Sequence, residues 1–284
     1  KDARATLTQV PSIPVGELTA QRIKFTGGQK YEVYSAPSTA SLRGGNGKAI
    51  VSTNDWIQVF GQENGFILIQ YDISSTHMRM GYIDAASLPR NATVNALNLQ
   101  RQNRVMAYAA ALTDDPLFSQ TALAQLTQGQ QVTLLANMGT WAYVETTVNG
   151  LTARGFVPQD ALMQLLDLSQ IPGGLYSDTK AFAQYQAKVV VERGADNSIT
   201  GISVYTVLPQ AWKTPASGVD ALVGYRLYEG NRASYQLSGW EDYQGLSVIR
   251  YTQGFVTQAD VLGLVPVYAL SGEKAEESLV VTLK

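Results

Sequence analysis

Short apolar runs separated by turn residues make up most of the chain from Ile23 onward. The runs are rich in Val, Ile, Tyr, Phe and Thr, and Gly, Asn, Asp or Pro bounds most of them, which is the pattern of strands joined by tight turns. The predicted strands include KYEVYS, WIQVFG, FILIQY, QVTLLA, WAYVETT, KVVVE, ISVYTVL, GYRLYEG and SLVVTLK. The predicted fold class is therefore all-β.

Helical periodicity is scarce along the chain. Residues 117–126 are the best candidate for one or two helical turns, because Asp115-Pro116 places a proline at a helix start. Short turns are also expected at residues 84–88 and 159–166. Residues 1–22, which have no sustained apolar period, are predicted to be a tail or linker.

A repeat is the most informative feature of the sequence. Residues 65–88 read GFILIQYDISSTHMRMGYIDAASL and residues 140–162 read TWAYVETTVNGLTARGFVPQDAL. Aligning them matches Phe66 with Trp141, Leu68 with Tyr143, Ile69 with Val144, Gly81-Tyr82-Ile83 with Gly155-Phe156-Val157, and Leu88 with Leu162. The spacing between the two aromatic residues differs by one residue between copies, which a hairpin loop absorbs. The alignment predicts two β-modules in tandem.

Each copy has the features of a small barrel. An aromatic-led strand is followed by a polar loop and by a second strand that ends in Gly, an aromatic residue and a β-branched residue. We expect Gly81 and Gly155 to permit close backbone approach where the barrel closes. We expect Leu88 and Leu162 to fill the barrel bottom after the final turn.

The sequence WIQVFGQENGFILIQY followed by RMGYIDAASL resembles a bacterial SH3-like (SH3b) domain, and YEVYSAPSTAS is similar to the first strand and first long loop of that family. The insert LRGGNGKAIVSTND departs from the usual short loop and resembles modules of secreted Gram-positive proteins. The resemblance implies two SH3-like barrels, at residues 23–89 and 95–166. The segment at residues 89–104, PRNATVNALNLQRQNR, is either flexible or supplies a strand to the second copy through its later part.

Residues 172–284 follow the break Ile171-Pro172-Gly173-Gly174 and contain seven short predicted strands, which suggests a β-sandwich. DNSITGISVY, VGYRLYEGN and the last 22 residues are similar to strands of a fibronectin type III module. Pro266 would force its strand to an edge or a bulge. Because GFVTQADVL at 254–262 echoes GFVPQDAL at 155–162, a third barrel copy is the alternative.

Composition narrows the chemistry that the chain can perform. It has 284 residues, no Cys, one His, 15% charged residues and a formal net charge of −2. Thiol nucleophiles, disulfides, thiolate metal sites and sites with two imidazoles are excluded by count. The charge gives no pull toward nucleic acid or an anionic membrane, and no apolar stretch is long enough for a membrane span. The composition is typical of a secreted bacterial protein without disulfides.

No motif predicts a catalytic residue, a metal site or a cofactor. His77 is expected to be a solvated loop residue, and the Gly44–Lys48 stretch a flexible loop tip. Asp114-Asp115 are expected to cap a helix, with a cation site as the alternative. Glu273, Glu276 and Glu277 are expected to lie in a polar hairpin loop. A carboxylate pair for glycoside hydrolysis stays open by count, but no local motif marks one.

Aromatic residues are the candidates for binding, because the resembled barrels display some of them in a groove that stacks on peptide or sugar. The candidates are Tyr31, Tyr34, Trp56 and Tyr82 in the first copy, with Trp141, Tyr143 and Phe156 as their counterparts in the second. A place in the barrel core is the alternative, and it is favoured for Phe66, Ile69, Tyr82, Trp141 and Phe156 taken individually.

The resemblance implies a non-catalytic extracellular binding module that attaches to peptidoglycan or to an extracellular peptide or protein. The alternative is a structural spacer or scaffold of a larger surface protein, with any enzymatic activity elsewhere in the parent chain. A wall hydrolase is the third hypothesis. It is the weakest, because the Cys-His and zinc sites usual in such enzymes cannot be built from no Cys and one His.

Overall fold

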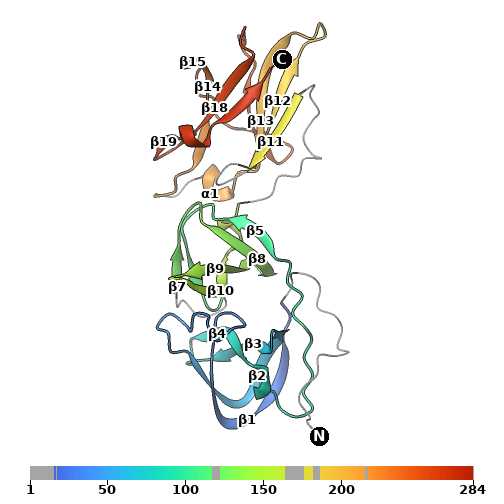
Figure 1. The fold of residues 1–284 in the computed structure, drawn as a ribbon, viewed down its shortest axis with the longest axis vertical. Helices are drawn as coiled ribbons and strands as arrows, with labels where there is room; N and C mark the ends of the chain where they lie inside the picture. Colours follow the sequence, from blue (N-terminus) through green and yellow to red (C-terminus); the bar gives the residue numbers. More distant parts are fainter. Residues whose placement is uncertain are drawn as a thin grey trace. The chain divides into compact units, whose positions relative to one another are not determined.

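The computed structural model describes residues 16, 18–116, 122–163, 176–181, 186–214 and 217–283. It divides into two compact units, of which the first comprises residues 1–104 and 109–159 and the second residues 105–108 and 160–284. Antiparallel strands dominate both units (Figure 1), and the only α-helix within the described ranges is α1 (Gln210–Lys213). The predicted all-β fold, with two small barrels followed by a sandwich, is confirmed.

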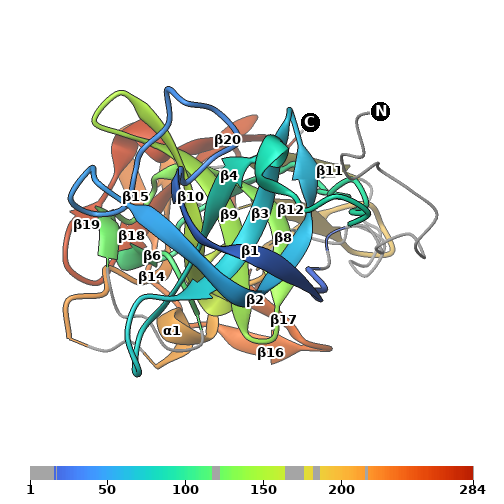
Figure 2. The same ribbon diagram turned by 90° about the horizontal axis from the view of Figure 1, so that it is seen from below.

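The first barrel is an antiparallel sheet of four strands in chain order. They are β1 (Gln21–Glu32), β2 (Ile50–Glu63), β3 (Phe66–Asp72) and β4 (Met78–Asp84). Just after β1, the Tyr34 amide donates to the Tyr82 carbonyl (2.8 Å) and the Tyr82 amide donates to the Tyr34 carbonyl (2.6 Å). This pairing joins the two ends of the sheet and closes the barrel, whose strands β1 to β4 are seen side by side in Figure 2.

The second barrel is built from a six-stranded sheet of order β5-β8-β9-β10-β6-β7. Its strands are β5 (Gln102–Val105), β6 (Ala110–Thr113), β7 (Ala122–Leu126), β8 (Gln131–Met138), β9 (Trp141–Val148) and β10 (Leu151–Pro158). Strand β7 shows that the expected helix at 117–126 is wrong over residues 122–126, and the rest of that segment lies outside the described residues. The expected short turns are present as the 3-10 helices η1 (Ala85–Ser87) and η2 (Gln159–Ala161).

The two copies of the repeat have the same strand register. Leu68 lies opposite Tyr82, and Tyr143 lies opposite Phe156, as the alignment requires. Thr113 pairs with Phe156 just as Tyr34 pairs with Tyr82. Equivalent residues therefore occupy equivalent places in the two barrels.

Two glycines sit where each barrel closes, as predicted. A Cβ on Gly81 would lie 2.4 Å from Val33 Cγ1, and a Cβ on Gly155 would lie 2.6 Å from the Thr113 carbonyl oxygen. Any larger residue would push the closing strands apart. Leu88 belongs to the core of the first barrel, as expected. Leu162 is also buried.

The segment between the copies is held in place by backbone hydrogen bonds. Gln62 pairs in parallel with Ala96, and the Leu97 amide donates to the Gln62 carbonyl (3.0 Å). Further along, the Gln100 amide donates to the Leu135 carbonyl of the second barrel (2.9 Å), and β5 then joins β8. Of the two alternatives, the segment supplies a strand to the second copy.

The N-terminal tail predicted at residues 1–22 is wrong at its end. Strand β1 begins at Gln21, and Leu18 is buried against residues of both barrels. Residues 1–15 lie outside the described ranges.

The second unit is a sandwich of two sheets. One has the order β11-β12-β13-β17-β16, and the other has the order β15-β14-β18-β19, with β20 also paired to β18. The strands are β11 (Tyr176–Ala181), β12 (Gln186–Arg193), β13 (Ile199–Thr206), β14 (Leu222–Glu229), β15 (Arg232–Tyr235), β16 (Glu241–Tyr243), β17 (Leu246–Tyr251), β18 (Val261–Tyr268), β19 (Gly272–Glu273) and β20 (Leu279–Thr282). The 3-10 helix η4 (Ala275–Glu277) precedes β20.

Pro266 and residues 254–262 are both part of this sandwich. Strand β18 is an interior strand, and Pro266 pairs with Tyr225 in regular register, so the expected edge position is wrong. The nearby register shift, between Leu222 and Gly224, lies in the neighbouring strand β14. Phe255 and Leu262 lie in the sandwich core, and this placement rules out the alternative of a third barrel.

Candidate functional site

The aromatic residues expected in an exposed groove converge instead between the two barrels of the first unit. Tyr34, Tyr82, Tyr143 and Phe156 are 8%, 0%, 2% and 0% exposed, and all belong to one apolar cluster. Trp141 is partly buried against the same cluster. The prediction of exposed rings that a ligand could contact is therefore wrong for Tyr34 and Tyr143, and the burial favoured for Tyr82 is confirmed, because each barrel covers the aromatic face of the other.

A β-bulge in each copy contributes to this arrangement. The register of β2 with β3 shifts between Val59 and Gly61, and that of β8 with β9 shifts between Leu134 and Ala136. The extra residues, Phe60 and Leu135, are both buried in the cluster between the barrels. A bulge reverses the alternation of side chains along a strand, and here it turns a large apolar residue toward the partner barrel.

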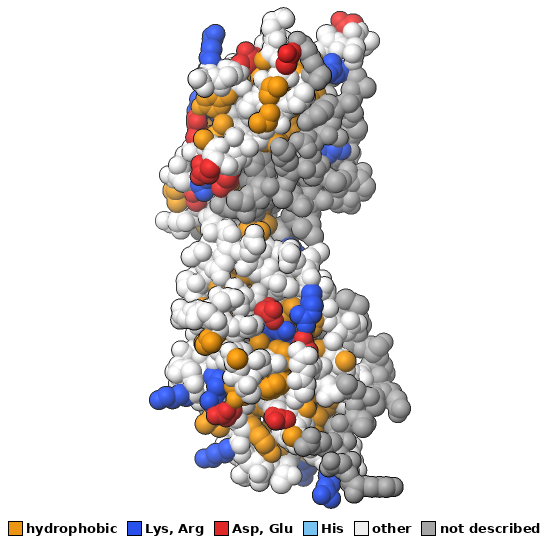
Figure 3. Space-filling view, in the orientation of Figure 1, with side chains coloured by type: hydrophobic (Ala, Val, Ile, Leu, Met, Phe, Trp, Pro, Cys, Tyr) orange, Lys and Arg blue, Asp and Glu red, His pale blue; other side chains and the backbone are white. Residues whose placement is uncertain are grey.

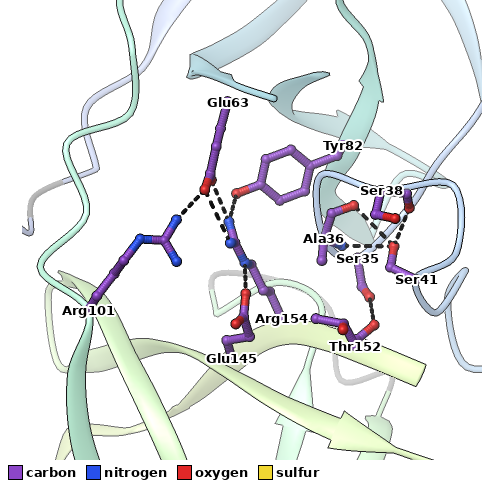
Figure 4. A network of polar contacts seen from close by, with 10 residues as sticks. All are labelled: Ser35, Ala36, Ser38, Ser41, Glu63, Tyr82, Arg101, Glu145, Thr152 and Arg154. Atoms are coloured by element: carbon purple, nitrogen blue, oxygen red, sulfur yellow. Dashed lines mark hydrogen bonds and ion pairs between the residues drawn. The ribbon is translucent and has the colours of Figure 1, made fainter. Parts of the chain in front are cut away.

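Arg154 is the polar centre of this interface, and its contacts are drawn in Figure 4. Its side chain is 3% exposed and donates from Nη1 to Glu63 Oε2 (2.7 Å) and to the Tyr82 hydroxyl (2.7 Å), and from Nε to Glu145 Oε2 (2.6 Å). Arg101 also donates to Glu63. Glu63 and Tyr82 come from the first barrel and Glu145 from the second, so one guanidinium joins the two.

The ionisation states in this network follow from burial and charge. Burial by itself lowers the pKa of Arg154, but the neighbouring Tyr82 and the hydrogen bonds to Glu63 outweigh burial. The net effect is a pKa above the ordinary value of arginine, and the guanidinium stays charged. Burial raises the pKa of the Tyr82 and Tyr143 hydroxyls, so both remain protonated. Because the Arg154 guanidinium stays charged beside two carboxylates, its role is to hold the two barrels together rather than to transfer a proton.

Asp114 and Asp115 belong to the same interface. Arg79 Nε of the first barrel donates to Asp114 Oδ2 (3.0 Å), and Gln70 Nε2 donates to Asp115 Oδ2 (2.5 Å). Both aspartates are nearly fully buried. They tie the second barrel to the first, and Arg79 and Gln70 lie where the alternative of a cation site would place an ion. The expected helix cap would involve residues 117–121, which lie outside the described ranges.

A concave surface on the first barrel, here called the first groove, has a volume of about 560 Å³. Its lining residues are Arg22, Ser52, Asn54, Trp56, Ile57, Gln58, Gln70, Tyr71, Asp72 and Met78. Of the six tyrosines and tryptophans predicted to bind a ligand, Trp56 alone lies here. Tyr31 is partly buried against the first barrel's own core.

Trp56 is held in an exposed position. Its side chain is 50% exposed on β2, and the Arg22 guanidinium lies 5.5 Å from its ring centroid. The preceding residue, Asp55, has a φ of 79° at a break in the pairing of β1 with β2. A non-glycine residue in this left-handed region costs free energy, and such strain is concentrated at functional sites.

A second concave surface, here called the second groove, encloses about 430 Å³ on the second barrel. Its lining residues are Asn103, Gln130, Gln131, Val132, Thr133, Glu145, Thr146, Thr147 and Thr152. The strand registers make it the counterpart of the first groove. Gln131, Thr133, Glu145, Thr147 and Thr152 occupy the places of Trp56, Gln58, Gln70, Asp72 and Met78.

The remaining candidates carry no site. His77 is exposed in a loop, as expected, and its Nδ1 lies 2.8 Å from Thr76 Oγ1. Glu273 is paired with Arg226, and Glu277 accepts from the Tyr268 hydroxyl. Within the described ranges, no group of three or more His, Asp or Glu side chains could hold a metal ion, and no helix is long and apolar enough to cross a membrane.

Charged side chains of both signs lie on the face drawn in Figure 3. On the face shown in Figure 3, basic and acidic side chains are intermixed, and neither sign forms a patch of its own. Arg154 was not predicted as a functional residue, although it is a lone charge in the otherwise apolar ARGFV. Arg79 and Gln70 were not predicted either, and no sequence signal marks them.

Comparisons with known proteins give little further information. No protein-family profile and no curated protein matches the chain. Two solved structures from Trichomonas vaginalis are similar in part, NlpC2 at 17% sequence identity and NlpC1 at 16%, each with a TM-score of 0.21. The matches cover 55% and 56% of this chain and 51% of each of those chains, so the chain spans about half their length. TM-scores this low support no statement about fold or function.

Proposed function

We propose that the chain is a non-catalytic extracellular binding module that attaches to peptidoglycan through the first groove. The observation that carries the proposal is the half-exposed Trp56 ring in a concave surface lined by hydrogen-bonding side chains. Tryptophan offers a large apolar face, and binding sites combine such a face with a few polar groups that set orientation. The muramyl glycan and its stem peptide present both apolar faces and amides.

The amides and hydroxyls of the groove support this assignment. Asn54, Gln58 and Ser52 provide donors and acceptors around the ring, while Arg22 and Asp72 contribute one charge of each sign. A groove with no net charge suits a ligand that carries amide and hydroxyl groups rather than a polyanion.

The non-catalytic and extracellular parts of the proposal rest on the sequence. With no Cys and a single His, the chain cannot form the Cys-His pair or the zinc site usual in wall hydrolases. The low charge, the lack of Cys and the resemblance to SH3b domains favour a secreted protein.

Co-sedimentation with purified peptidoglycan sacculi tests the proposal. Wild-type chain is expected to sediment with the sacculi, and Trp56→Ala is expected to reduce the bound fraction at least tenfold. Ile50→Ala is the matched control, because Ile50 lies on the same strand, is also 50% exposed and does not line the groove. Equal binding by wild type, Trp56→Ala and Ile50→Ala would refute the role of the first groove.

A structural spacer is the second candidate, and the interface between the barrels favours it. The two barrels bury their aromatic faces against each other and share the Arg154 network. Such packing limits movement of one barrel against the other, as a spacer requires. Failure of the wild-type chain to sediment with sacculi would support the spacer and remove the binding proposal.

A further inference from the structure

We infer that the second groove is a separate binding site for a neutral glycan. The inference extends the proposed binding function to a second surface with its own ligand chemistry. It starts from the register equivalence of the two grooves, which places a concave surface at the same position in each copy of the repeat.

The lining of the second groove is hydrogen-bonding almost throughout. Eight of its nine lining residues are polar, and the ninth, Val132, is 4% exposed. Four are threonines, and Asn103, Gln130 and Gln131 add amides. Hydroxyl and amide side chains both donate and accept, as sugar hydroxyls and N-acetyl groups do.

The charge of the groove also fits a neutral ligand. Its one carboxylate, Glu145, is 27% exposed and accepts from Arg154 Nε at 2.6 Å, so the acidic group is paired with a buried cation. This ion pair fixes the orientation of Glu145 and leaves its Oε1 as an acceptor for a ligand hydroxyl. A strongly cationic or anionic ligand would find no unpaired counter-charge among the lining residues.

The position of the groove argues against a peptide. All its lining residues except Gln130, which directly precedes β8, come from β5, β8, β9 and β10, so the groove crosses the face of the sheet. Peptides are bound in extended form by adding to a free sheet edge or by seating side chains in apolar pockets. Here β8, β9 and β10 are each paired on both sides, the edge strand β5 contributes only Asn103, and an apolar pocket is lacking in the lining.

The two grooves differ in a way that separates their ligands. The place of Trp56 in the first groove is taken by Gln131 in the second, and the place of Met78 by Thr152. The first therefore provides an apolar face, and the second provides hydrogen bonds alone.

The test is calorimetric titration of the full chain with a hexamer of β-1,4-linked N-acetylglucosamine, alongside a glycine pentapeptide. The key variant is Thr133→Val/Thr147→Val, which keeps the shape of both side chains and removes two hydroxyls at the groove. Thr200→Val is the matched control, because Thr200 is an exposed strand residue in the sandwich. Losing two hydrogen bonds should weaken glycan binding about tenfold or more, since each 1.4 kcal/mol is tenfold.

The outcomes separate this inference from the proposed function. Hexamer binding that Thr133→Val/Thr147→Val weakens, and that Thr200→Val and Trp56→Ala leave unchanged, supports a glycan site in the second groove, whether or not sacculi are bound. Hexamer binding that only Trp56→Ala weakens, no hexamer binding, or tighter binding of the pentapeptide would overturn it. Sacculus binding that depends on Trp56 alone would leave the proposed function standing without the second site.

Discussion

Replacing Arg154 with methionine is the sharpest test of how the two barrels are joined. Met80 occupies the equivalent place in the first copy, so a methionine suits the local strand geometry. The change leaves Glu63, Glu145 and the fully buried Tyr82 hydroxyl without their shared donor. The backbone pairing of β10 is preserved, and the measured effect reports the side chain.

The expected cost follows from burial. Removing one partner of a buried ion pair costs about 3–5 kcal/mol, because the remaining charge stays desolvated. Glu63 and Glu145 are 14% and 27% exposed, and Arg101 still pairs with Glu63, so we expect the lower end, about 3 kcal/mol. Arg154→Lys keeps the charge but loses the planar fork, and it should cost less than Arg154→Met.

The measurement must resolve one part of a chain with several domains, since no single unfolding free energy describes such a chain. Hydrogen exchange as a function of denaturant, read by mass spectrometry on peptides from β9 and β10, gives the local free energy. Peptides from β12 and β13 of the sandwich serve as the internal control. A loss below about 1 kcal/mol in β9 and β10 for Arg154→Met would show that the network contributes no more than exposed ion pairs do.

Three further predictions concern other parts of the chain. Gly155→Ala should destabilise the second barrel by about 2 kcal/mol or more, since its Cβ would lie 2.6 Å from a carbonyl oxygen, whereas Gly263→Ala, with its nearest atom at 3.8 Å, should be tolerated in the same exchange experiment. Partial burial raises the pKa of Asp220, but the Ser271 hydroxyl and two backbone amides outweigh it and hold that pKa below its ordinary 3.8. The stabilisation from these bonds is therefore present above about pH 4 and is lost as the pH falls through the lowered pKa. Asp220→Asn should lower the thermal midpoint at pH 7, and the difference in midpoint between wild type and variant should narrow toward pH 3. A difference that stays constant with pH would contradict this. Trp56→Ala should change the stability of the first barrel by less than about 1 kcal/mol, because half of the ring is already in water, and a larger loss by denaturant unfolding would assign Trp56 to the core.

The alternation of apolar and polar residues correctly predicted the strands of the repeat, because each of these strands buries one face. The alignment of Leu68 with Tyr143 and of Gly81 with Gly155 is reproduced in the observed register. The close approach at the two glycines is also present. These features are predictable because strand alternation and the lack of a Cβ act within a few residues of the chain.

The candidate site was predicted only in part, because exposure depends on which surface another element covers. Trp56 lies in a groove, whereas Tyr34, Tyr82 and Tyr143 are covered by the facing barrel. Sequence alone cannot separate a ring that faces a ligand from one that faces a neighbouring domain, since both need the same apolar area. The strand at 122–126 was missed for a related reason: Asp115-Pro116, between it and its pairing partner β6, is a helix-start signal in the sequence.

The sequence by itself determined the all-β class, the tandem repeat, the glycine positions and the exclusion of thiol and multi-histidine chemistry, because composition and short-range alternation are properties of the chain. Only the tertiary structure decided that the two copies pack aromatic face to aromatic face around Arg154, and that a groove remains on each barrel. The physical reason is that the burial of a side chain depends on which other surface packs against it. Trp56 and Tyr82, both aromatic strand residues of the first barrel, are 50% and 0% exposed.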